Sequence, residues 1–164
     1  GYMKKSSDIA LAGILLALAC GLSYIESITP LPLPVGAKPG LASIIVMFAA
    51  IRLNLKSTIS IVILKSLFVF ITRGFTAFLL SASGGIFSLI IMLMLFRIFR
   101  CSVTFTSAMG AVSHNCAQLI AAGLFYYQSL SPIGAYFPIM IITGCVTGIF
   151  TGSVLSLILK YHFE

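Results

Sequence analysis

The stretch Ile59-Ser-Ile-Val-Ile-Leu-Lys-Ser-Leu-Phe-Val-Phe-Ile71 decides the fold class of this chain. It is apolar apart from two serines and Lys65, and with its neighbours it is long enough to form a membrane-spanning helix. A lysine at the centre of such a helix costs about 2.5–3.5 kcal/mol on insertion. We therefore expect Lys65 to face a cavity, a counter-charge or an anionic ligand. The alternative is a side chain that snorkels towards the membrane surface.

The composition of the whole chain agrees with a membrane location. Its 164 residues are 60% hydrophobic and 8% charged, with a mean hydropathy of +1.16. A soluble domain has about 25% charged residues, and the apolar runs here are too continuous for an outer-membrane barrel. We predict an all-α integral membrane protein with a single domain over residues 3–164, Gly1-Tyr2 being a cloning remnant. Its four cysteines form no C-x-x-C pair, so they predict neither a zinc site nor a disulfide framework.

Six transmembrane helices are predicted, over residues 8–27, 41–53, 57–72, 83–99, 104–128 and 134–161. Pro30, Pro32 and Pro34 require a loop before the second helix, because proline cannot continue a helix. The second helix spans about 20 Å, which is short for a hydrocarbon core of about 30 Å. A break is predicted between Arg73-Gly74 and Ser83-Gly84-Gly85, so that the fourth helix would start near Ser83 and direct free N–H groups at an anion.

The basic residues lie mainly on one side of this predicted bundle. With both termini on the same face, the opposite face carries only Lys38 and Arg73. Cytoplasmic loops are enriched in Lys and Arg, so both termini are predicted to be cytoplasmic. This accounts for most of the net charge of +7 without a nucleic-acid partner. The residues on the cytoplasmic face are Lys4, Lys5, Arg52, Lys56, Arg97, Arg100 and Lys160.

The remaining polar residues gather in the outer half of the predicted bundle. His114 and Gln118 are four residues apart and share a helix face. Because cations outnumber carboxylates, we expect a cavity open to the exterior that binds a small organic anion. Each residue also has a simpler explanation: an interfacial ion pair for Glu26, a solvated loop for Lys38, interhelical hydrogen bonds for His114. The candidate residues are Glu26, Lys38, Lys65, Arg73, Ser83, Gly84, His114, Asn115 and Gln118.

Two stripes of small residues have a four-residue spacing that lets another helix approach closely. The first contains Gly13, Ala17 and Gly21 and the second Gly144, Gly148 and Gly152. Spacing alone does not distinguish packing within the chain from docking of a partner.

Enzyme chemistry has little support in the sequence. The chain has three carboxylates, and two of them, Asp8 and Glu164, lie near its ends. An isoprenoid diphosphate synthase needs clustered aspartates to hold Mg²⁺, and the sequence has no such cluster. It also has no Walker motif, so any use of ATP requires a partner chain. We predict a binding protein without a cofactor of its own.

Three stretches resemble a known bacterial family, described as heptaprenyl diphosphate synthase component I or Gx transporter. They are Lys38-Pro-Gly-Leu-Ala42, Gly84-Gly85 with Phe87-Ser88, and Gly110-Ala-Val-Ser-His-Asn-Cys-Ala-Gln118. The last is the most specific, although Ala117 replaces a glycine that is frequent in relatives, and Ser43 replaces an asparagine. The resemblance covers nearly the whole chain from Met3.

This family is similar to the substrate-binding (S) components of energy-coupling factor (ECF) transporters. The similarity implies six helices in the bacterial cytoplasmic membrane, an outward-facing pocket, and a complex with a transmembrane T subunit and two ATPases. It also implies that the stripe of Gly13, Ala17 and Gly21 docks on the T subunit. Genes for relatives often lie near polyprenyl synthase, quinone and flavin genes, which suggests a quinone or isoprenoid precursor, or a flavin, as the ligand. The alternative is a non-catalytic membrane subunit that assists a polyprenyl diphosphate synthase.

Overall fold

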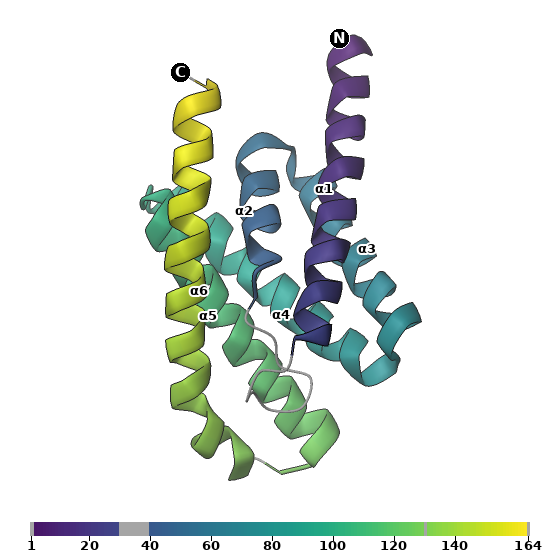
Figure 1. Cartoon of the computed structure of the whole chain (residues 1–164), viewed down its shortest axis with the longest axis vertical. Helices are drawn as coiled ribbons and strands as arrows, with labels where there is room; N and C mark the ends of the chain where they lie inside the picture. The colour runs from purple at the N-terminus through teal and green to yellow at the C-terminus, as the bar shows by residue number, and fades with distance from the viewer. Residues whose placement is uncertain (1, 30–39, 130, 164) are drawn as a thin grey trace.

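The computed structural model describes residues 2–29, 40–129 and 131–163. Lys38, a candidate ligand contact, lies outside the described residues. Two helices, α4 (Phe75–Leu93) and α5 (Val103–Ala122), are each extended by five residues of π-helix, η1 (Met94–Ile98) and η2 (Gly123–Tyr127). The prediction of six helices is confirmed (Figure 1). They are α1 (Tyr2–Ile28), α2 (Ser43–Arg52), α3 (Leu55–Arg73), α4 (Phe75–Leu93), α5 (Val103–Ala122) and α6 (Ser131–Phe163).

Local sequence explains several helix ends. The side chain of Asn54 accepts a hydrogen bond from the Ser57 N–H at 2.8 Å and caps the start of α3. Ser102 caps α5 in the same way through the N–H of Phe105. Gly74 alone separates α3 from α4, and its φ of +87° is a conformation that glycine adopts without steric cost.

Four helical segments are long and apolar enough to cross a membrane. Large apolar side chains such as Ile71 and Phe150 are exposed on the outer faces of these helices, where lipid is a more favourable neighbour than water. The chain is therefore a helical membrane protein. The segments are Ser6–Ile28, Leu55–Arg73, Phe75–Ile98 and Ile133–Tyr161.

The short helix α2 lies inside the bundle and does not cross the whole membrane. Its ten residues cover about 15 Å at 1.5 Å per residue, which is half of a hydrocarbon core of about 30 Å. Met47 is fully buried and packs in a core with Val62, Met92 and Leu155 from three other helices. At the carboxyl end of α2, the guanidinium of Arg97 donates a hydrogen bond to the Ala50 carbonyl at 3.3 Å. A cation is favourable at this end of a helix.

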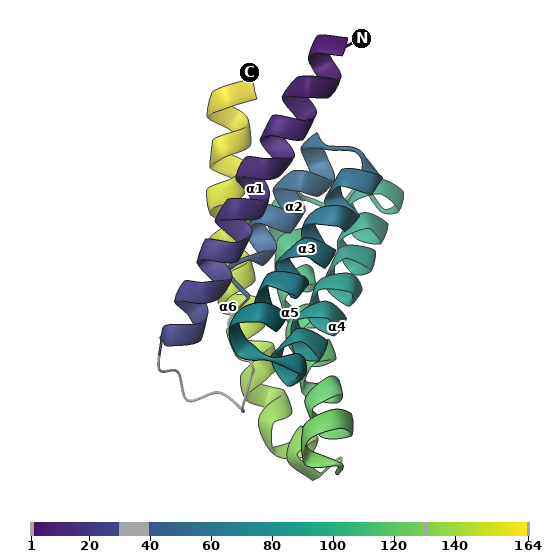
Figure 2. The same cartoon turned by 90° about the vertical axis from the view of Figure 1, so that its right-hand side faces the viewer.

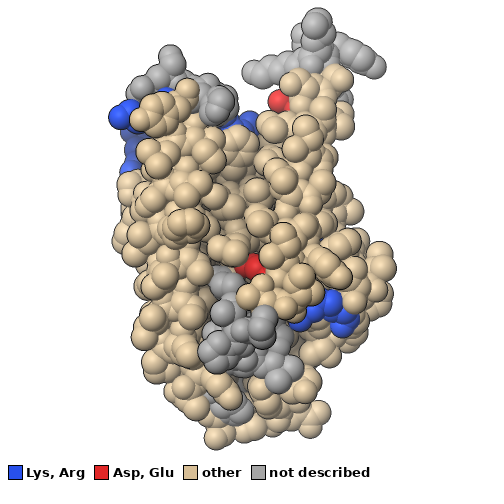
Figure 3. Space-filling view, viewed as in Figure 1, with Lys and Arg blue, Asp and Glu red and all other residues tan. Residues whose placement is uncertain are grey.

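Both chain termini lie at the same end of the bundle, which we call the terminal end (Figures 1 and 2). The opposite end, which we call the far end, carries the α3–α4 and α5–α6 connections (Figure 1). On the face drawn in Figure 3, charged atoms are sparse, and blue atoms gather near the terminal end and at one place lower on the molecule. The shared position of the termini matches the predicted topology.

The two stripes of small residues differ in what they contact. A Cβ added at Gly148 would lie 2.5 Å from the Cα of Ala108, and Cβ atoms at Gly144 and Gly152 would lie 2.8 Å from Cα atoms of α5. Real Cβ atoms do not approach so closely, so the stripe on α6 packs against α5 within the chain. The stripe on α1 is different: Gly13, Ala17 and Gly21 are exposed, and a Cβ at either glycine would meet nothing within 4 Å.

The predicted break between α3 and α4 is confirmed at Gly74, but its extension to Ser83-Gly84-Gly85 is wrong. The α4 helix begins at Phe75, after Gly74, and runs through all three residues. Both glycines are buried, and a Cβ at Gly85 would lie 2.9 Å from Val62 of α3. They therefore permit close helix packing and do not end a helix, so no free N–H groups lie there.

Candidate functional site

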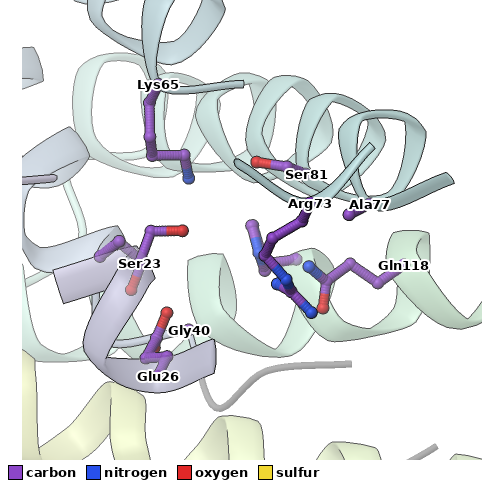
Figure 4. A pocket seen from close by; sticks show the side chains of 11 residues that line it. Ser23, Glu26, Gly40, Lys65, Arg73, Ala77, Ser81 and Gln118 are labelled. Carbon is purple, nitrogen blue, oxygen red and sulfur yellow. The ribbon is translucent and has the colours of Figure 1, made fainter. Parts of the chain in front are cut away.

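A polar cavity lies where α1, the start of α2, α3, α4 and α5 meet (Figure 4). The side chains of Lys65, Arg73, Ser81 and Glu26 point into a common space from three helices (Figure 4). The space that remains between the lining residues is about 10 Å³, enough for about one water molecule. The lining residues are Ser23, Glu26, Gly40, Ala42, Ser43, Lys65, Arg73, Ala77, Ser81, His114 and Gln118.

The cavity lies about halfway along the bundle. Lys65 is ten residues after Leu55, the first residue of α3, and therefore about 15 Å from the terminal end. Ser43 begins α2, whose ten residues run back to that end, and His114 is eleven residues into α5. These three residues come from distant parts of the sequence and lie at about the same height.

Lys65 is the most deeply buried cation of the site, with 3% of its surface exposed. None of the described residues forms a hydrogen bond or ion pair with its ammonium group, although the Glu26 carboxylate attracts it electrostatically. The buried position excludes snorkelling to the membrane surface. A buried ammonium group without a close partner is costly, and it is a strong attractant for an anion.

Glu26 lies near the end of α1 and connects it to the start of α2. Its side chain is 6% exposed, and one carboxylate oxygen accepts a hydrogen bond from the Leu41 N–H. The carboxylate also attracts the guanidinium of Arg73. Arg73 is exposed, so it marks the side of the cavity nearest the surface. Glu26 and Arg73 thus line the same cavity, with opposite charges.

His114 and Gln118 line the cavity from α5, one helical turn apart. Both are buried, and both lie against Gly84 of α4, where a Cβ would be 2.8 Å from the His114 ring and 2.9 Å from Gln118 Cγ. Gly84 therefore gives these two side chains the room they occupy.

Three other candidates, Ser83, Gly84 and Asn115, do not line the cavity. The Ser83 hydroxyl donates a hydrogen bond back to the Leu80 carbonyl, and it is Ser81 that faces the cavity. The Asn115 amide is fully buried and donates to the Met140 carbonyl at 3.0 Å, so it joins α5 to α6. Interhelical hydrogen bonding, the simpler explanation given above for the adjacent His114, is thus found at Asn115.

Sequence reasoning missed Ser23 and Ser43 as lining residues. Ser23 is three residues before Glu26 and shares its helix face, a spacing that could have identified it. Ser43 gave no such signal, because its position depends on how α2 enters the bundle.

A second hollow lies between α3 and α4, and only apolar side chains line it. The residues include Ile59, Ile63 and Ile90, all exposed. Apolar side chains offer a ligand no hydrogen bond or charge, so the polar cavity is the better candidate for a specific ligand. Across the described ranges, no group of three His, Cys, Asp or Glu side chains is placed to hold a metal ion.

The comparison with protein families identifies the chain. The family model of heptaprenyl diphosphate synthase component I matches residues 15–158. The chain belongs to this family. A search of curated proteins and a search of solved structures returned no match.

The match includes every candidate residue of the cavity, from Glu26 to Gln118. It confirms the resemblance drawn from the three sequence stretches.

Proposed function

We propose that this protein is the substrate-binding (S) component of an ECF-type uptake transporter and binds a small organic anion from the exterior. The observation that carries the proposal is the buried Lys65 in a polar cavity halfway along the bundle. Placing a cation inside the membrane costs free energy, and binding an anionic ligand would offset this cost. Arg73, on the exposed side of the cavity, extends the positive potential towards the far end.

The exposed stripe on α1 supports a helical membrane partner. We propose that Gly13, Ala17 and Gly21 dock on the T subunit, since small residues allow two helices to approach closely in lipid. The matching stripe on α6 is covered by α5, which leaves α1 as the small-residue face open to another chain. In this proposal two partner ATPases hydrolyse ATP, and the loaded S component reorients to carry its cavity to the cytoplasm.

The basic residues support the orientation. Four basic residues lie within the last or first turns of helices at the terminal end, which we propose is cytoplasmic on the positive-inside rule. They are Arg52, Lys56, Arg97 and Lys160. The far end then faces the exterior, and Arg73 lies on the side from which the ligand arrives.

Assembly tests the proposal. The chain is co-expressed with a T subunit and two ATPases from the same organism, and the purified complex and ligand uptake are measured. The double variant Gly13→Leu/Ala17→Leu is expected to insert normally but to lose the complex, since two isobutyl groups would keep the helices apart. Val146→Leu, an exposed position on α6, is the matched control and should assemble. Uptake that does not need the T subunit and ATPases would contradict the proposal.

A second candidate function is favoured by the family description itself. In this alternative the chain is a non-catalytic membrane subunit that assists a polyprenyl diphosphate synthase. It predicts that a soluble prenyltransferase gains activity when this protein is added in lipid vesicles. Activity that is independent of the added protein supports the transporter.

A further inference from the structure

The amino end of α2 opens into the polar cavity. Gly40, Ala42 and Ser43 line it, and the N–H of Leu41, between them, is donated to the Glu26 carboxylate. The start of a helix presents N–H groups and the positive end of the helix dipole, which together attract an anion. In this structure the anion in that place is the side chain of Glu26.

The hydroxyl of Ser43 provides a second, independent indication of a ligand. The residue is 5% exposed and lines the cavity, and its Oγ has no hydrogen-bond partner in the part of the chain that the structure describes. A buried hydroxyl is normally paired, because an unpaired one costs the free energy of its lost hydration. Ser43 is thus a donor in the cavity that lacks an acceptor.

The opposite wall of the cavity supplies positive charge. The side chain of Lys65 points from α3 towards the space that Glu26 enters from α1, and Arg73 points into the same space (Figure 4). We call the Leu41 N–H, the Ser43 hydroxyl and the Lys65 ammonium the α2 anion site. Its donors come from the turn before α2, from the first residue of α2 and from α3, and all of them favour a carboxylate over a neutral group.

The cavity is too full to admit a ligand without a rearrangement, since it leaves room for about one water molecule. We propose that the Glu26 carboxylate takes one donor of the α2 anion site, the Leu41 N–H, as an internal substitute, and that the substrate is a monocarboxylic acid whose carboxylate displaces it and binds all three donors. This inference rests on the proposed binding function and specifies its ligand. Glu26 is then a competitor that sets the affinity for the substrate.

The charge of the cavity favours a singly charged ligand. Among its described lining residues, Lys65 and Arg73 are positive and Glu26 is negative, so two positive charges less one negative leave +1. One carboxylate balances this charge. A diphosphate ester, with about three negative charges, would leave an excess of two in a region of low dielectric constant, where unpaired charge is costly.

The test vacates the site and refills it with acetate as the probe. The full-length Glu26→Ala variant is purified in detergent, and its thermal unfolding midpoint is measured in sodium acetate and in sodium chloride of equal ionic strength. Acetate at ten times its dissociation constant is expected to raise the midpoint by about 3–6 °C above chloride. Wild-type protein and the Asp8→Ala control should show no difference between the two salts. Adding Lys65→Met to Glu26→Ala should abolish the acetate effect.

Several results would overturn the inference. Equal midpoints of Glu26→Ala in acetate and chloride would show that no exchangeable carboxylate site exists. A larger stabilisation by pyrophosphate than by acetate would refute the monocarboxylate class. If Glu26→Ala does not fold, the Glu26→Ser variant is extracted in acetate and in chloride, and equal recovery in both salts also refutes it. The experiment needs no partner subunit, so an acetate effect without T-subunit-dependent uptake would reject the transporter alone.

Discussion

Replacing Gly148 with alanine puts a methyl group 2.5 Å from the Cα of Ala108 and 2.9 Å from the Ser107 carbonyl oxygen. These are backbone atoms, so α5 and α6 must move apart to accept the new group. Overpacking of this kind costs about 1–3 kcal/mol, and a backbone contact places it at the upper end. The same change at Gly13 meets nothing within 4 Å and gains up to about 1 kcal/mol of helix propensity. We therefore expect opposite signs at the two positions and a difference of about 3 kcal/mol.

The assay is reversible unfolding of the purified chain in mixed micelles, followed by circular dichroism as the denaturing detergent increases. Gly148→Ala should unfold at a clearly lower detergent fraction than wild type, and Gly13→Ala at the same or a higher one. Equal midpoints for the two variants would refute the reasoning, because they would mean that the stripes on α1 and α6 have the same environment. In the co-expression assay, only changes on α1 should then affect assembly at constant stability.

Three further predictions concern the cavity and one helix start. Lys65→Met should abolish co-purification of a ligand in native mass spectrometry while membrane insertion is retained, and an unchanged ligand signal would contradict the site. Lys56→Met changes an exposed lysine of the same helix and should keep the ligand. Gly84→Ala should lower the thermal midpoint through overpacking of about 1–3 kcal/mol and weaken ligand binding, because His114 and Gln118 must shift towards the cavity. A wild-type midpoint and affinity would show that these two side chains have room to move. Asn54→Ala should destabilise the chain by about 1 kcal/mol through loss of the α3 cap, as measured by detergent unfolding, while Asn54→Asp should retain most of the stability.

The sequence predicted the number of helices and most of their ends, because apolar length, prolines and capping residues are local signals. Its main error concerned Gly84 and Gly85, which looked like a break between helices. In lipid, glycine inside a helix is tolerated when a neighbouring helix packs on it, and only the positions of Val62 and His114 reveal that packing. A pattern in one chain segment does not contain this information.

The candidate site was predicted in part. The free-energy cost of a lysine at the centre of a membrane helix identified Lys65 from the sequence alone. The structure brings four other candidates to the same cavity: Glu26, Arg73, His114 and Gln118. Ser83 and Asn115 were assigned to the cavity wrongly, because helix phase decides which of two neighbouring polar residues faces it: Ser81 lines the cavity, whereas Asn115 faces α6. The spacing of the small-residue stripes could not show which one is covered, since both have the same four-residue repeat.

The shortness of α2 has an electrical consequence. A helix of ten residues ends about 15 Å into the membrane, so an anion at its amino end lies about halfway across a voltage drop. Moving one charge through the full drop is worth about 2.3 kcal/mol per 100 mV. Half of that, for an evenly falling field, is about 1.1 kcal/mol, or roughly a sevenfold change in affinity. With the proposed orientation, a potential that is negative inside weakens loading from the exterior and favours release, so membrane voltage becomes a regulator of this binding site.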